Sequence, residues 1–169
     1  MNKRGFTLIE LVLVMGILAI LSTIILGNFN TTLKKGRDAQ RKNDFSQIQK
    51  ALENYYEDNQ TYPLFTDIFG KKLCKSEKCL VNGETVYMVK VPNDPSSATY
   101  VYVYAPDLST PGAAHSYYLY SFMENTNDTS QNLSVTGFTT QADCNKSGIG
   151  SLCRYYVSSS NAAVLTPNP

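Results

Sequence analysis

The chain has 169 residues, which leaves room for one modest domain with a terminal extension. Its formal net charge of +1 gives no strongly basic surface of the kind that binds nucleic acid, so we expect no nucleic-acid partner. The single histidine, His115, argues against a histidine-based metal centre or a histidine-dependent nucleophile.

The first predicted element is a membrane-spanning helix at residues 6–29. This run contains one charged residue, Glu10, and no proline. As a helix it is about 36 Å long, and a hydrocarbon core is about 30 Å thick. Its Leu, Ile, Val and Phe residues favour insertion by about 5–9 kcal/mol, whereas one carboxylate costs about 2.5–3.5 kcal/mol. A cleaved signal peptide is the alternative, but its apolar core is shorter, about 7–15 residues.

The residues at the start of this run form a motif. A basic leader, residues 1–5, ends in Gly5 and is followed by Phe6 and by Thr-Leu-Ile-Glu at 7–10. This order resembles the N-terminus of type IV prepilins and type II secretion pseudopilins. The resemblance implies that a membrane-embedded prepilin peptidase cleaves between Gly5 and Phe6, and that Phe6 is then N-methylated. It also implies assembly by an inner-membrane platform with a cytoplasmic ATPase.

The same resemblance implies a role for Glu10 in assembly. A carboxylate in an apolar phase needs a cation within reach. After cleavage, the α-amine of Phe6 in a neighbouring subunit would supply that cation, and the pair would set the register between helices. The alternative is a hydrated Glu10 at headgroup depth. Where related helices often have a proline, this chain has Gly27. The sequence is compatible both with local melting of the helix at this position and with a continuous helix.

Residues 30–59 are predicted to continue the helix as an amphipathic segment. Apolar residues recur at three- and four-residue steps on one stripe, which we expect to pack on a sheet: Phe45, Ile48, Leu52, Tyr55 and Tyr56. Residues 36–44 form a mixed cluster rich in basic residues that resembles the major pseudopilin of type II secretion. It is expected to contact anionic headgroups or acidic faces of neighbours, or to be a solvated helix face.

Residues 60–169 are predicted to form a β-rich head, which gives an α+β, pilin-like fold with a small antiparallel sheet. An Asn-Gly pair at 82–83 predicts a hairpin within residues 80–86, and a strand follows at 86–91. Residues 99–104 alternate tyrosine with valine, and we expect the valine face to meet the helix and the tyrosines to face outward. A further strand is expected at 116–124, and residues 158–169 read as a loose tail.

The four cysteines allow three pairings, and the sequence alone does not choose among them. Local pairing, Cys74–Cys79 and Cys144–Cys153, closes the shortest loops and would stabilise the fold by about 2–3 kcal/mol per bridge. The second pair resembles the disulfide-bounded loop of many type IV pilins. A zinc site would require closer cysteine spacing. Disulfides form and persist in oxidising compartments, so these cysteines favour a location of the head outside the cytoplasm.

Orientation in the membrane is not decided by charge. More basic residues follow the predicted span than precede it, which by itself would keep the head in the cytoplasm. The cysteines and the pilin resemblance favour a single-pass inner-membrane protein with its head outside the cytoplasm. Asp128 and Glu124 are too few carboxylates for a calcium site, so we expect no metal and no cofactor.

The expected function is that of a structural subunit, not an enzyme. The resemblance implies a subunit of a type IV pilus-like filament, with copies of itself and related pilins or pseudopilins as partners. The major pseudopilin of a type II secretion system is the close alternative. A minor-pilin-type binding or adhesion module is an alternative of another class.

Overall fold

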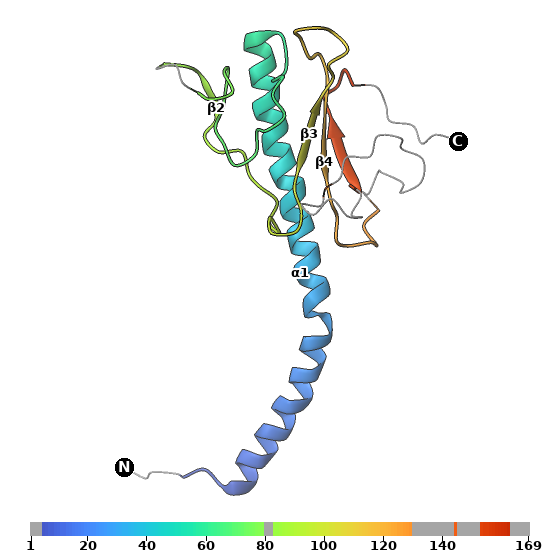
Figure 1. Cartoon of the computed structure of the whole chain (residues 1–169). Helices are drawn as coiled ribbons and strands as arrows, with labels where there is room; N and C mark the ends of the chain where they lie inside the picture. Colours follow the sequence, from blue (N-terminus) through green and yellow to red (C-terminus); the bar gives the residue numbers. More distant parts are fainter. Residues whose placement is uncertain (1–4, 80–82, 130–143, 145–152, 163–169) are drawn as a thin grey trace, which may run out of the picture.

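The computed structural model describes residues 5–79, 83–129, 144 and 153–162, and within them the side chains of all but residues 23–28. A single helix, α1 (Leu8–Asn59), makes up the N-terminal third of the chain. Its second half lies against the β-rich head, and its first half projects away from the head (Figure 1). This arrangement confirms the predicted α+β fold with a long N-terminal helix.

Both ends of α1 have local causes. The Thr7 side chain caps the N-terminus by accepting a hydrogen bond from the Glu10 backbone N–H at 3.4 Å. Gln60 ends the helix in the left-handed conformation, with φ of 58°, and donates its backbone N–H to Tyr56. The helix continues through Gly27 without a break. No helix in the part of the chain that the structure describes is long and apolar enough to cross a membrane.

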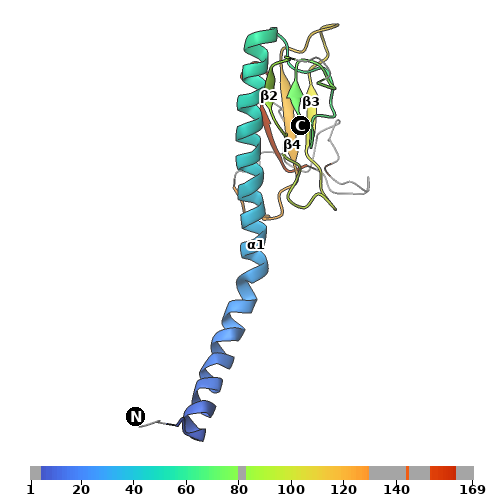
Figure 2. The same ribbon diagram turned by 90° about the vertical axis from the view of Figure 1, so that its left-hand side faces the viewer.

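The head contains two small antiparallel sheets. Strands β1 (Leu73–Cys74) and β2 (Val86–Met88) form one pair. Strands β3 (Val103–Pro106), β4 (Tyr117–Ser121) and β5 (Tyr155–Ser158) form a sheet in that spatial order. The strands lie on one side of the upper half of α1 (Figure 2). Strand β4 is therefore central, and its alternate residues face the helix.

The helical stripe predicted from the sequence forms the core. Phe45, Ile48 and Leu52 are completely buried, and Tyr55 is 5% exposed. They pack with Tyr117 and Leu119 of β4, which are also completely buried. Burying side chains of this size stabilises a fold by about 1.5–3 kcal/mol each. The second half of α1 is thus held by packing against the sheet, as the spacing of its apolar residues predicted.

The expected orientation of the tyrosine–valine strand is wrong. Tyr102 and Tyr104 are buried, at 4% and 2% exposed, and point toward the helix side. Val103 is half-buried and packs on the opposite face, against the Cys144–Cys153 disulfide. Tyrosine can face inward here because its hydroxyl finds an acceptor: Tyr102 donates to Asp44 at 2.9 Å, and Tyr104 to the Pro63 carbonyl at 2.8 Å.

Several strands differ in extent from the expectation. The strand expected from residue 99 begins at 103, where pairing with β4 starts. Part of the expected 80–86 hairpin, residues 80–82, lies outside the described residues. Strand β1 has only two residues, too few for a strand to be recognised in a sequence. Strand β5 has four residues and forms by pairing with β4, which lies more than 30 residues earlier in the chain.

The buried hydroxyl of Tyr102 provides a test of this packing. We expect Tyr102→Phe to destabilise the full chain in detergent by about 1–2 kcal/mol, because the Asp44 carboxylate loses a donor in a buried site. Tyr100→Phe is the matched control, since Tyr100 is half-buried, and we expect less than about 0.5 kcal/mol. Urea unfolding measures both, and equal effects would contradict the inward orientation of Tyr102.

Candidate functional site

The polar centre of the molecule is Arg41, where α1 meets the head. Its side chain is completely buried. The guanidinium donates two hydrogen bonds to Asp94, at 2.8 and 2.9 Å, and a third to Asp38 at 2.6 Å. Glu124 approaches the same guanidinium at 3.0 Å. One helix residue is therefore joined to the loop before β3 and to the segment after β4.

Two neighbouring cations of α1 extend this junction. Arg37 donates to both carboxylate oxygens of Glu124, at 2.8 and 2.5 Å, in the two-pronged geometry typical of strong Arg–carboxylate pairs. Lys42 pairs with Asp128 at 2.6 Å. We call this set the junction network; its members are Arg37, Asp38, Arg41, Lys42, Asp94, Glu124 and Asp128.

Asp38 completes the connection through the backbone. Its carboxylate accepts hydrogen bonds from the backbone N–H groups of Glu124 at 3.0 Å and Asn125 at 2.8 Å. A buried carboxylate must have such donors, because desolvation of an unpaired charge costs several kcal/mol. The segment after β4 is thus fixed to α1 by side-chain pairs and by its own backbone.

The pKa values in the network follow from these contacts. Hydrogen bonds from Arg37, and then from Arg41, lower the pKa of Glu124 to about 2, although partial burial acts in the opposite direction. Burial by itself would lower the pKa of Arg41, but its bonds to Asp94, Asp38 and Glu124 raise it above the ordinary value. Burial raises the pKa of Asp44, which borders the network. At neutral pH Glu124 and Arg41 are therefore both charged.

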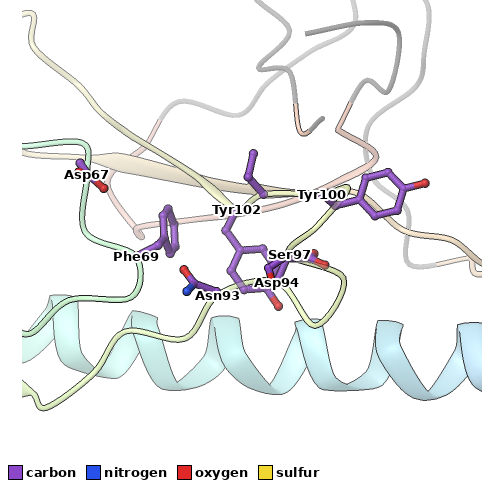
Figure 3. Close-up of a pocket in the computed structure, with 8 residues that line it drawn as sticks. Asp67, Phe69, Asn93, Asp94, Ser97, Tyr100 and Tyr102 are labelled. Carbon is purple, nitrogen blue, oxygen red and sulfur yellow. The ribbon is translucent and has the colours of Figure 1, made fainter. Parts of the chain in front are cut away.

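A pocket of about 370 Å³ opens beside the junction network (Figure 3). Asp94 and Tyr102, which both bond to residues of α1, form part of its wall, together with Phe69 and Tyr100. These carboxylate and phenol groups are already engaged with the helix.

The two carboxylates considered for calcium have other partners. Glu124 is bound by Arg37 and Arg41, and Asp128 by Lys42. Among the described residues there is no group of three or more His, Cys, Asp or Glu side chains placed to hold a metal ion. Arg37 and Arg41 bind the two carboxylate oxygens of Glu124, and Lys42 binds Oδ2 of Asp128.

The basic cluster of α1 is therefore largely an internal structure. Headgroup contact, contact with neighbours and a solvated face were the three expectations for residues 36–44. Instead, Arg37, Arg41 and Lys42 bind carboxylates of their own head. The signal in the sequence was the Arg-Asp-x-x-Arg spacing at 37–41 together with the Asp-Pro turn at 94–95, but neither identifies its partner.

The residues implicated in processing lie at the free end of α1. Gly5 precedes the helix, and Phe6 is 83% exposed. Glu10 lies in the first turn, is exposed, and bonds through its backbone to the Thr7 cap. Leader residues 1–4 lie outside the described residues. Side chains from residue 5 to residue 22 are all exposed, so this half of α1 has no contact with the head.

Two disulfides are present in the head. Cys74 is bonded to Cys79, and Cys144 to Cys153. The first joins the end of β1 to the loop that follows it. The second is buried and packs against Val103, Tyr120, Phe122 and Tyr156 on the outer face of the three-stranded sheet.

The fold and the N-terminal features together define a class of protein. A long helix with an exposed apolar first half and a β-rich head on its second half is the pilin-like arrangement. Residues 1–26 match the family of the prokaryotic N-terminal methylation motif. The chain is therefore a pilin-like protein that carries this motif.

The particular family follows from the rest of the chain. Residues 28–135 match the family of type II secretion system protein G, and the chain belongs to this family. It is 28% identical over 102 residues to type II secretion system core protein G of Dickeya chrysanthemi, a match that covers 59% of this chain and 67% of that protein. It is 32% identical over 62 residues to the corresponding protein of Pectobacterium carotovorum subsp. carotovorum, covering 37% and 40%. No solved structure matches the chain.

These comparisons change the order of the functional expectations. The sequence analysis placed a type IV pilus subunit first and a type II secretion pseudopilin second. The match to protein G supports the second better than the first. The family is one of structural filament subunits rather than enzymes.

The junction network predicts a large effect of Arg41. We expect Arg41→Met to destabilise the full chain by about 3–5 kcal/mol, because Asp94 and Asp38 remain buried without their cation. Lys71→Met is the control. The side chains of Lys71 and its partner Asp67 are both about half exposed or more, so we expect this variant to lose less than about 1 kcal/mol of stability. Chemical unfolding of both variants is the measurement. The double variant Arg41→Met/Asp94→Leu should recover part of the lost stability. A double variant whose loss equals the sum of the losses in the two single variants would contradict the pairing.

The lowered pKa of Glu124 predicts a loss of stability in acid. The pKa lies at about 2 in the folded chain against an ordinary value of 4.5, so this contribution is complete above pH 4.5 and disappears as the pH falls toward 2. We expect the free energy of unfolding to fall by about 2–3 kcal/mol over this range. The raised pKa of Asp44 acts in the opposite sense, because it increases the free energy of unfolding as the pH falls. Glu124→Gln should remove most of the slope; an unchanged pH profile in that variant would contradict the assignment.

Proposed function

We propose that the chain is the major pseudopilin of a type II secretion system, a structural subunit that polymerises through its N-terminal helix. The observation that carries the proposal is the division of α1 into two halves. The second half is covered by the head, whereas the first exposes apolar side chains such as Leu8, Ile9 and Ile20, each at least 66% exposed. So large an apolar surface requires either lipid or other subunits as its surroundings.

Processing would free this half of the helix for assembly. In the proposal a prepilin peptidase removes residues 1–5 by cutting between Gly5 and Phe6, and Phe6 is N-methylated. The match of residues 1–26 to the N-terminal methylation motif supports both steps. Phe6 is exposed and lies outside α1, so a protease can reach the bond before it.

Before assembly, residues 6–29 would anchor the chain as a single membrane span. The head would lie outside the cytoplasm, where its two disulfides persist. After extraction the apolar half would pack against the same half of other subunits. An inner-membrane assembly platform with a cytoplasmic ATPase would drive this step, since nothing in the sequence resembles a phosphate-binding loop for ATP.

Glu10 would set the register of the filament. In the membrane it lies near the end of the span, where burial of a carboxylate costs less than at the centre. In the filament its carboxylate would pair with the α-amine of a neighbouring Phe6. Phe6 and Glu10 are four residues apart, so the pair fixes an axial offset of about 6 Å between helices. A pair that neutralises two buried charges discriminates strongly against other offsets.

Replacement of Glu10 tests this role. We expect Glu10→Val to leave insertion and cleavage intact, because removing a carboxylate favours insertion, by less than the roughly 2.5–3.5 kcal/mol that applies at the centre of a span. The variant should not form filaments and should not restore exoprotein secretion in a strain that lacks the chain. Glu57→Val, the same change at an exposed position near the other end of α1, is the control and should assemble normally. Filaments of normal length from the Glu10 variant would contradict the proposed pair.

Two further measurements separate the proposed function from its alternatives. Mass spectrometry of the native protein should find Phe6 as the first residue with one added methyl group. Electron microscopy of sheared cell surfaces with an antibody to the chain should show no long labelled fibres, while deletion should abolish exoprotein secretion. Long labelled fibres with normal secretion would instead identify a type IV pilus subunit.

A further inference from the structure

Positive charge is concentrated in residues 71–90. This segment has five lysines and two glutamates, in a chain whose formal net charge is +1. It carries β1 and β2 and lies to one side of the upper part of α1, apart from the three-stranded sheet (Figure 1). The lysines are Lys71, Lys72, Lys75, Lys78 and Lys90. Neither the fold nor the proposed filament function accounts for this asymmetry.

The Cys74–Cys79 disulfide turns part of this segment into a pocket. Cys74 is completely buried and pairs with Val86 in the two-stranded sheet, which fixes one end of the loop. The bond to Cys79 folds the loop back, so that Lys78 returns to the side of Lys71 and Lys72. The resulting hollow has a volume of about 300 Å³ and is lined by Lys71, Lys72, Glu77, Lys78 and Cys79.

The charges around this hollow are poorly neutralised. Lys71 pairs with Asp67 at 2.5 Å, but these side chains are 48% and 71% exposed, so the pair is weak and easily exchanged. Neither Lys72 nor Lys78 forms an ion pair with any carboxylate that the structure describes. The nearby Glu84 accepts hydrogen bonds from the backbone N–H and the hydroxyl of Ser76.

We propose that this lysine pocket binds a phosphate group, either free or as a phosphate monoester. A phosphate monoester carries a charge of about −1.5 to −2 at pH 7 and has three strong acceptor oxygens, which suits a pocket lined by three lysines and one glutamate. A carboxylate has one charge and two oxygens and fits this lining less well. Lysine binds phosphate as a compact point charge, without the planar geometry that an arginine site would impose.

The position of the pocket limits where the phosphate comes from. The loop is tied to α1 by the Tyr55 hydroxyl, which donates to the Lys75 carbonyl at 3.1 Å. Residue 55 is 26 residues beyond the end of the proposed span at residue 29, a rise of about 39 Å along the helix. This step rests on the proposed function. The headgroups of the anchoring membrane are then out of reach, and the source is a soluble phosphate or a lipid of a second membrane.

Phosphate titration of the full chain tests the site. The chain is held in phosphatidylcholine nanodiscs, and inorganic phosphate is followed by phosphorus NMR. We expect Lys72→Gln/Lys78→Gln to weaken binding on the order of tenfold. Lys75→Gln/Lys90→Gln removes the same charge from the same segment outside the pocket lining, and should change the affinity less than twofold. Equal weakening by the two double variants, or no binding by the unchanged chain, would overturn the proposal.

Three further arms sharpen the result. Acetate at matched ionic strength should not displace phosphate, and displacement would overturn the choice of phosphate over carboxylate. Cys74→Ser/Cys79→Ser keeps every lysine but opens the loop, and should weaken binding as much as the pocket variant; unchanged affinity would overturn the role of loop closure.

Phosphatidylcholine vesicles containing phosphatidic acid are then added to the nanodiscs. Recruitment of these vesicles to the nanodiscs that depends on Lys72 and Lys78 supports a lipid as the source of the phosphate. Binding of inorganic phosphate without recruitment of vesicles supports a soluble source.

The phosphate test and the filament test are independent. Loss of assembly by the Glu10 variant concerns the apolar half of α1, whereas the segment that carries the lysine pocket lies beside the upper part of α1, away from the free end of the helix (Figure 1). A chain that fails to bind phosphate but still assembles contradicts only the pocket. A chain that binds phosphate but does not assemble contradicts only the filament proposal.

Discussion

The burial of Arg41 is the interaction on which the arrangement of helix and head depends. A guanidinium with no exposure to water is stable only when its donors meet carboxylates, and Asp38, Asp94 and Glu124 supply them. These three partners come from α1, from the loop before β3 and from the segment after β4. The network therefore fixes where the head attaches along a helix whose apolar stripe alone would tolerate small shifts.

Attachment at this point has a mechanical consequence for a filament subunit. Arg41 lies just beyond the exposed half of α1, so the junction network marks the place where the free helix becomes part of the head. A force applied along the helix would reach the head through buried ion pairs and the core stripe together. The interdigitated core resists displacement by close packing, and the charge-assisted hydrogen bonds of the network add a directional constraint.

The same network neutralises the carboxylates of the described segment after β4. Lys42 and Arg37 reach across from α1 to the two acidic side chains of that segment. A cationic side chain on a rigid helix does locally what a bound cation would do, since it neutralises the carboxylates and fixes the chain that carries them. The two disulfides act elsewhere in the head. One closes the loop that lines the lysine pocket, and the other packs on the outer face of the three-stranded sheet.

The sequence by itself determined the features that depend on local composition. These are the long helix, its apolar first half, the stripe that packs on the sheet and the leader motif before Phe6, because helical spacing and hydrophobicity are written in consecutive residues. Only the tertiary structure decided which face of the tyrosine–valine strand is buried, because that depends on Asp44 and Pro63 as distant acceptors. It also decided that Arg41 is internal, since a charge is buried only when its partners arrive at the same point, and two of them, Asp94 and Glu124, are more than 50 residues away along the chain.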